Sequence, residues 1–227
     1  MRNLMKAELF KLLHGKELLI CIAAGFVLPV LMIAVGGYEN GKVVLTTESR
    51  EIIGLVIGTL FAVAYVGKDF TSKTVHHALT SGAGRGQVFG SKFLSYQIAC
   101  FLLLTLNILS MGGGYSLFYG WGQRFTGEEM FFAVVYSLTG IFFDMCILSV
   151  PFFICALLRS QALSMAASFG MIGLTIALSQ MPWSYIAAQA ASRRFGTMEL
   201  MYFLFFLLSA CILYTASLFY FKRQDIL

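Results

Sequence analysis

Long apolar runs separated by short polar connections are the feature of this sequence that most constrains its fold. Each run approaches the roughly 20 residues that an α-helix needs to cross about 30 Å of hydrocarbon. Hydrophobic residues make up 59% of the 227-residue chain and charged residues 12%, unlike the composition of soluble domains. Because a bilayer offers no partners for free backbone groups, and the pattern leaves little room for a barrel's alternating strands, the sequence predicts an all-α polytopic membrane protein.

Six apolar runs predict six transmembrane helices in a single domain that covers residues 1–227. The second run is short and the fourth is long, with Pro151 inside it. Since proline removes a backbone donor and clashes with the preceding turn, a kink or break is predicted within residues 143–151. Neither an internal repeat nor a linker divides the chain. The predicted spans are residues 18–35, 52–66, 96–118, 130–158, 162–181 and 200–221.

Lysines and arginines between the spans predict the orientation in the membrane. The N-terminus, the loop 67–95, the turn after the fourth span and the C-terminus carry eleven of them, and the opposite side carries the remaining five of the 16. Because short cytoplasmic segments are enriched in Lys and Arg, the chain is predicted to lie in the inner (cytoplasmic) membrane with both termini in the cytoplasm. Contact with anionic lipid, rather than nucleic acid, accounts for the basic excess.

Two segments outside the spans are predicted to lie at the membrane surface. Within residues 1–17, Met5, Leu9 and Leu12 share one side of a helix, which is typical of an interfacial helix; an extension of the first span is the alternative. Residues 182–199 are too polar to span and hold aromatic residues suited to headgroup depth. They predict an outer-face or re-entrant hairpin, with an ordinary loop as the alternative.

The cytoplasmic loop 67–95 has the most distinctive local pattern. Asp69 is suited to cap a short helix, because an aspartate accepts hydrogen bonds from the free N–H groups at a helix start. An amphipathic helix with basic flanks can dock into a groove on a cytoplasmic protein. A plain connection between the second and third spans is the alternative. The docking side would be formed by Phe70, Thr74, Val75, Ala78 and Leu79.

This loop resembles the corresponding loop of the type-2 ABC exporter permease family. The start and the end of the chain are similar to that family too, so that the likeness in layout covers essentially the whole chain. In one departure, Ala83 and Gly84 stand where many relatives have a proline just before the arginine. The likeness is carried by Gly67, Asp69, Phe70, Thr74, Leu79, Arg85 and Lys92 in the loop, by Glu8, Leu9, Lys11 and Leu12 near the start, and by Tyr220, Phe221, Arg223 and Asp225 near the end.

The resemblance implies the permease subunit of an ATP-driven exporter. In such permeases the loop carries a coupling helix that contacts the ATPase, the N-terminus forms an elbow helix, and two six-span subunits form the pathway. ATP and magnesium would be bound by separate ABC ATPase subunits, so this chain is predicted to be no enzyme and to hold no cofactor. Its other implied partners are a second copy or a related permease, and membrane lipid. The implied ATPase-coupling residues are Asp69, Phe70, Thr74, Val75, Ala78, Leu79 and Arg85.

The small six-span build resembles permeases that export amphipathic or antimicrobial peptides, and a lipid-like substrate is the alternative. Short loops leave no room for a large external binding domain. Two other functions stay open: a proton-coupled secondary transporter, and a non-transporting membrane sensor or immunity protein. A membrane-embedded enzyme is disfavoured, because the spans contain neither an H-E-x-x-H pair nor paired carboxylates.

Polar residues inside the predicted spans are candidates for the transport pathway. Asp144 is the only acidic residue deep inside a span, where an ionisable group is costly unless it is paired or wetted. It would line the conduit or meet a cationic substrate; a hydrogen-bonded aspartate that stabilises packing is the alternative. Asn107 in the third span is the second pathway candidate, with a hydrogen bond between helices as its alternative.

Three tempting patterns predict no site. Residues 36–42 match the spacing of a phosphate-binding loop, but Val43 stands where a Ser or Thr would bind magnesium. His76 and His77 are adjacent and therefore point to different sides of a helix. The five cysteines lie in apolar runs and form no C-x-x-C pair. The sequence therefore predicts no metal site.

Overall fold

The computed structural model describes residues 2–35, 41, 52–71, 84–122, 127–158, 160–179, 215 and 219. Throughout these residues the regular structure is helical and contains no strand, which confirms the predicted all-α class for this part of the chain. The elements are α1 (Arg2–His14), α2 (Lys16–Val35), α4 (Ile52–Phe61), the π-helix η1 (Ala62–Gly67), α5 (Lys68–Thr71), α7 (Arg85–Tyr119), α8 (Gly127–Leu158) and α9 (Gln161–Ser179).

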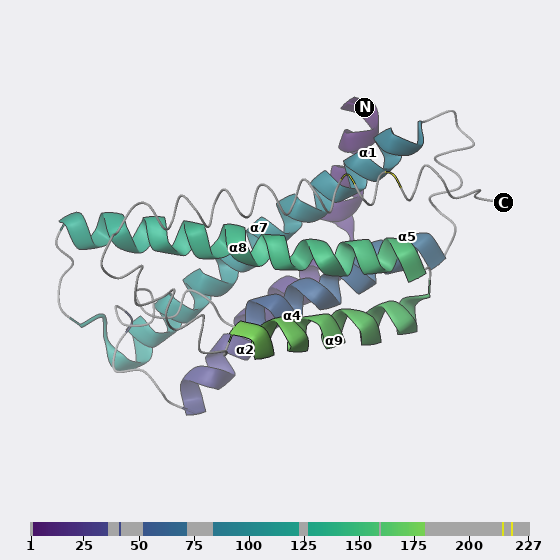
Figure 1. The fold of residues 1–227 in the computed structure, drawn as a ribbon. Coiled ribbons are helices and arrows are strands. Elements are labelled where there is room, and N and C mark those ends of the chain that lie inside the picture. Colours follow the sequence, from purple (N-terminus) through teal and green to yellow (C-terminus); the bar gives the residue numbers. More distant parts are fainter. Residues whose placement is uncertain are drawn as a thin grey trace.

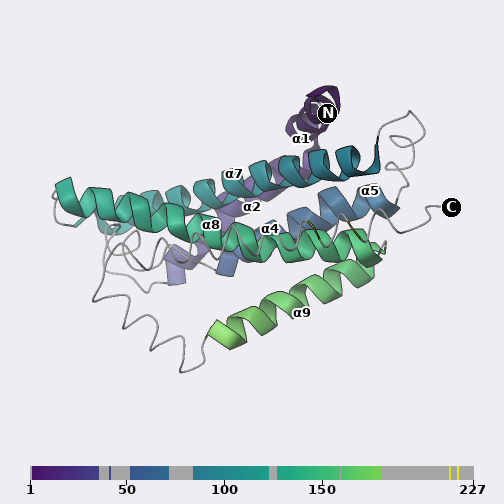
Figure 2. The same ribbon diagram turned by 45° about the horizontal axis from the view of Figure 1, so that its top comes forward.

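The long helices run side by side in alternating directions (Figures 1 and 2). One end of the bundle holds the end of α5, the start of α7, the end of α8 and the start of α9 (Figure 1). α1 also meets α2 at this end (Figure 1). The predicted topology placed these same helix ends together on the cytoplasmic side. The bundle therefore gathers α1 and the two flanks of the loop 67–95 at one end.

Among the described residues, two helices are long and apolar enough to cross a membrane, namely α7 and the part of α8 from Gly140 to Leu158. A third span is formed if α1 and α2, which bend by 52° at their junction, are counted as one broken unit. Ile52–Gly67 is a shorter apolar helix. The predicted spans at 18–35, 52–66, 96–118, 130–158 and 162–181 each overlap a described helix. The predicted hairpin 182–199, and the predicted span 200–221 apart from residues 215 and 219, lie outside the described residues.

α8 runs from Gly127 to Leu158 without a break, so of the kink or break predicted within residues 143–151 only the kink stays a prediction. Pro151 cannot pair with the carbonyl group four residues before it, and the helix usually opens at such a point. Here the neighbouring carbonyl of Leu148 accepts a hydrogen bond of 2.9 Å from the Tyr96 hydroxyl of α7. Tyr96 and Phe152 also pack together in the core, with ring centroids 5.4 Å apart. Packing against α7 thus stabilises α8 next to the position where Pro151 removes a backbone hydrogen bond.

Two glycines of α4 allow its close approach to its neighbours. A Cβ atom at Gly54 would stand 2.8 Å from Leu104 of α7, and one at Gly58 would stand 2.4 Å from Leu148 of α8. Small residues spaced four apart let helix backbones approach closely. The Gly-x-x-x-Gly pattern is therefore used inside this chain, at the centre of the bundle.

Gly58→Ala is expected to destabilise the protein by about 1–3 kcal/mol, because the added Cβ would overlap the methyl groups of Leu148, which is fully buried. Unfolding in a single detergent measures the effect. Gly113→Ala in α7 is the matched control, because no atom lies within 4 Å of its added Cβ. This control should be neutral or slightly stabilising. Equal midpoints for the two variants would contradict the tight α4–α8 contact.

Candidate functional site: a buried ion cluster

A cluster of charged side chains lies where α1, α5 and α7 meet. The carboxylate of Asp69 accepts hydrogen bonds from the ammonium groups of both Lys11 and Lys92. Asp69 and Lys92 are each only 3% exposed. The Lys92 ammonium also lies 3.0 Å from Oε1 of Glu8, which is on α1. Lys11 and Lys92, which are 58 and 23 positions from Asp69 in the sequence, are thereby held beside it.

Tyr65 completes this cluster from the π-helix. Its hydroxyl donates to Oε2 of Glu8 at 2.8 Å and lies 3.3 Å from the Ser95 hydroxyl. The ammonium nitrogens of Lys11 and Lys92 lie 5.7 and 5.9 Å from the centroid of its ring, within the range of cation–π attraction. Two acids and two bases thus balance in charge around one aromatic ring. We refer to Glu8, Lys11, Tyr65, Asp69 and Lys92 as the ion clamp.

The π-helix η1 sets the direction of two clamp residues. It interrupts an otherwise α-helical segment that runs from Ile52 to Thr71, and it carries Tyr65 four residues before Asp69 of α5. A π-helix holds one residue more in its turn than an α-helix and is often found at functional positions. Its side chains are almost all buried. The unusual turn thus lies in the packed interior, next to the charged cluster.

Electrostatics explains why Asp69 can be buried as an anion. Burial alone would raise the pKa of its carboxyl group, but Lys92 and Lys11 together outweigh burial and hold this pKa below its usual value. Asp69 therefore stays charged at neutral pH. Removing one partner from such a buried network would leave an uncompensated charge, which is far more costly than losing an exposed ion pair.

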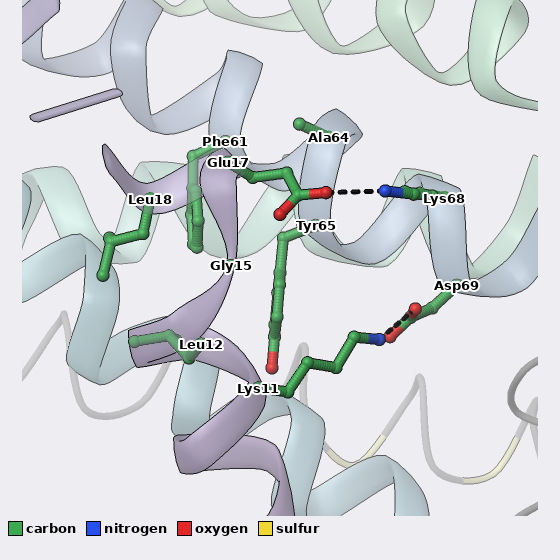
Figure 3. Close-up of a pocket in the computed structure, with 10 residues that line it drawn as sticks. All are labelled: Lys11, Leu12, Gly15, Glu17, Leu18, Phe61, Ala64, Tyr65, Lys68 and Asp69. Atoms are coloured by element: carbon green, nitrogen blue, oxygen red, sulfur yellow. Dashed lines mark hydrogen bonds and ion pairs between the residues drawn. The ribbon is translucent and has the colours of Figure 1, made fainter. Parts of the chain in front are cut away.

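A second, more exposed ion pair lies beside the clamp. Lys68 of α5 donates to Oε1 of Glu17 on α2 at 2.7 Å, and this hydrogen bond lowers the pKa of Glu17. Between the two ion pairs lies a pocket of about 220 Å³ at the bend between α1 and α2 (Figure 3). It is lined by Lys11, Leu12, Gly15, Glu17, Leu18, Phe61, Ala64, Tyr65, Lys68 and Asp69.

The predicted capping role of Asp69 is wrong. Asp69 lies within a helix that begins seventeen residues earlier at Ile52, and its carboxylate is bonded to lysines. Arg85 is the first residue of α7, after Gly84 as the N-cap residue. Phe70 belongs to α5. Of the other predicted coupling residues, Thr74, Val75, Ala78 and Leu79 lie outside the described residues.

The two pathway candidates are both buried, each being 4% exposed. Asp144 lies in α8 and Asn107 in α7. The Asn107 side-chain nitrogen has no hydrogen-bond partner within the described part of the chain, so the predicted hydrogen bond between helices is not made by this atom. Its backbone carbonyl accepts from Ser110, whose hydroxyl also bonds to Gly25 of α2. Both residues are on helices of the bundle rather than at the ion clamp.

The sequence pattern does not predict a charged cluster that contains Glu8, Lys11, Tyr65 and Lys92. The signal that was present is local: Glu8 and Lys11 are three residues apart on α1 and so share one side of it. Lys92 stands inside α7 with no acidic residue near it in sequence. A lysine in that position needs a partner from elsewhere in the fold, which only the packing of α1 and α5 supplies.

The charges of the ion clamp hold α1, α5 and α7 together through ion pairs. The clamp pairs each charge internally, and within the described residues no group of three or more metal-ligating side chains forms. Comparison with protein-family models, with curated proteins and with solved structures gives no match.

Proposed function

We propose that this chain is the six-span permease subunit of an ATP-binding cassette exporter. In this proposal it pairs with a second copy or a related permease in the cytoplasmic membrane, with both termini in the cytoplasm. Separate ABC ATPase subunits bind ATP and magnesium and drive the export of an amphipathic substrate, a peptide above all. The resemblance of residues 67–92 and of both chain ends to such permeases supports this assignment.

The ion clamp is the observation that carries the proposal. Asp69 begins residues 69–80, the segment in which the sequence predicts the ATPase contact, and Lys92 lies beyond the end of this segment. Their ion pair joins the end of the α4–η1–α5 helix to α7, while Lys11 joins α1 to α5 and Glu8 joins α1 to α7. Work from an ATPase requires an element that both partners bias. Because Asp69 and Lys92 are paired, a force on the segment between them would act on both α5 and α7.

The test is purification of the tagged chain from cells that produce it naturally. We expect two permease chains together with two ATPase chains, and ATP hydrolysis that the exported substrate stimulates. A monodisperse single chain that moves substrate without ATP would overturn the proposal.

A proton-coupled transporter is the second candidate, and the burial of Asp144 within α8 favours it. A carboxyl group inside a span can carry a proton across it. Replacing Asp144 by Asn separates the two functions. Transport that follows a pH gradient and is lost in this variant favours the second candidate, whereas ATP-dependent export retained in the variant favours the first.

A further inference from the structure

The pocket at the bend between α1 and α2 lies at the level where apolar surface gives way to charge. Phe10 and Leu13 on α1, and Leu19 and Ile20 on α2, are each more than 60% exposed, which suits contact with lipid chains. Charged side chains stand among them in the sequence and at the pocket rim. This change from apolar to charged surface within one turn of the bend is expected at headgroup depth.

The pocket also has an apolar part and a charged part. Leu12, Leu18 and Phe61 form apolar walls, whereas Lys68 and Glu17 face each other at its edge (Figure 3). Gly15 keeps the space open, because a Cβ atom there would stand 2.9 Å from Oε2 of Glu17 and equally close to the Lys11 carbonyl oxygen. A ligand for this site therefore needs a small polar group joined to an apolar body.

The two edge charges can exchange partners. The Lys68 side chain is 63% exposed and that of Glu17 is 25% exposed, so their ion pair is largely solvated and contributes little to stability. A purely anionic ligand would occupy Lys68 and leave Glu17 without a cation. A zwitterionic group satisfies both, with its phosphate on Lys68 and its ammonium on Glu17. Lys11 and Asp69 stay paired with each other in either case.

We propose that this pocket binds the headgroup of one zwitterionic aminophospholipid, phosphatidylethanolamine being the probe of choice. The phosphate accepts hydrogen bonds from Lys68, the ammonium donates to Glu17, and the acyl chains follow the exposed apolar residues of α1 and α2. The proposal needs a membrane but no ATPase, so it stands independently of the exporter assignment.

Binding to the delipidated, purified chain tests it, with native mass spectrometry as the readout. We expect one phosphatidylethanolamine to bind about tenfold or more tightly than phosphatidylglycerol with the same acyl chains, since each charge-assisted hydrogen bond to the headgroup adds affinity. Glu17→Gln and Lys68→Gln should each abolish this preference, and the conservative Lys68→Arg should keep it. Lys16→Gln is the matched control, because Lys16 is an exposed neighbour of Glu17 that does not line the pocket.

Three results would overturn the proposal. The first is equal affinity of the parent chain for the two lipids. The second is an unchanged preference in Glu17→Gln while its thermal unfolding matches that of the parent. The third is competition by free phosphoethanolamine at the same concentration as the lipid, which would assign the pocket to a soluble metabolite.

Discussion

Replacing Asp69 by Asn is expected to lower the free energy of unfolding by about 3–5 kcal/mol, the usual cost of removing one partner from a buried ion pair. Lys92, which is 3% exposed, would keep only Glu8 as a counter-charge. The ammonium groups of Lys11 and Lys92 would then lie on either side of an uncharged amide. Chemical or thermal unfolding of parent and variant in the same detergent measures the difference. The substitution preserves side-chain shape, so that the change of charge is tested by itself.

Glu17→Gln provides the control for this experiment, because it breaks an exposed ion pair at the same end of the bundle and should cost no more than about 1 kcal/mol. The double variant Asp69→Leu with Lys92→Met removes both charges together. Since apolar replacement of a whole buried pair is often neutral, this double variant should be more stable than Asp69→Asn. A loss below 1 kcal/mol in Asp69→Asn would show that the clamp does not hold the fold.

Placing a charge on the predicted docking side, as in Leu79→Asp, is expected to abolish ATP-driven export while leaving the chain inserted in the membrane. An unpaired carboxylate in a buried protein contact is costly, and a single such residue at the centre of an interface can dominate binding. The ATPase should therefore fail to co-purify, or its hydrolysis should no longer respond to substrate. Pull-down and ATPase assays on the same preparation measure both outcomes.

The matched control is Gln87→Asp, which adds the same charge on an exposed residue in the first turn of α7. An acid there is favourable beside a helix N-terminus and lies off the predicted docking side. Export in this variant should resemble that of the parent. Normal export and ATPase binding by Leu79→Asp would show that residues 69–80 are a plain connection and would contradict the predicted ATPase contact.

The positions of the helices could largely be predicted from the sequence, because hydropathy and length act within each segment. Residues 18–35 were predicted as a span, and α2 covers Lys16–Val35. The role of Asp69 could not be predicted in this way. The capping rule considers only the next few residues, whereas the partners of Asp69 are Lys11 and Lys92, brought to it by the packing of α1 and α7. The continuity of α8 through Pro151 could not be predicted from local sequence either, since Tyr96, which bonds to the Leu148 carbonyl, belongs to another helix.

The π-helix η1 makes chain length between Ile52 and Thr71 as important as residue identity. A π-turn is equivalent to one inserted residue, and an α-helix turns by about 100° per residue. A homologue with one residue fewer in this interval could close the π-turn to an ordinary α-turn and still direct its aspartate toward the two lysines. The present number of residues wound as a continuous α-helix would instead turn Asp69 away from Lys11 and Lys92 by about a quarter of a turn. A single-residue gap in this interval is therefore compatible with the clamp only if the π-turn is lost with it.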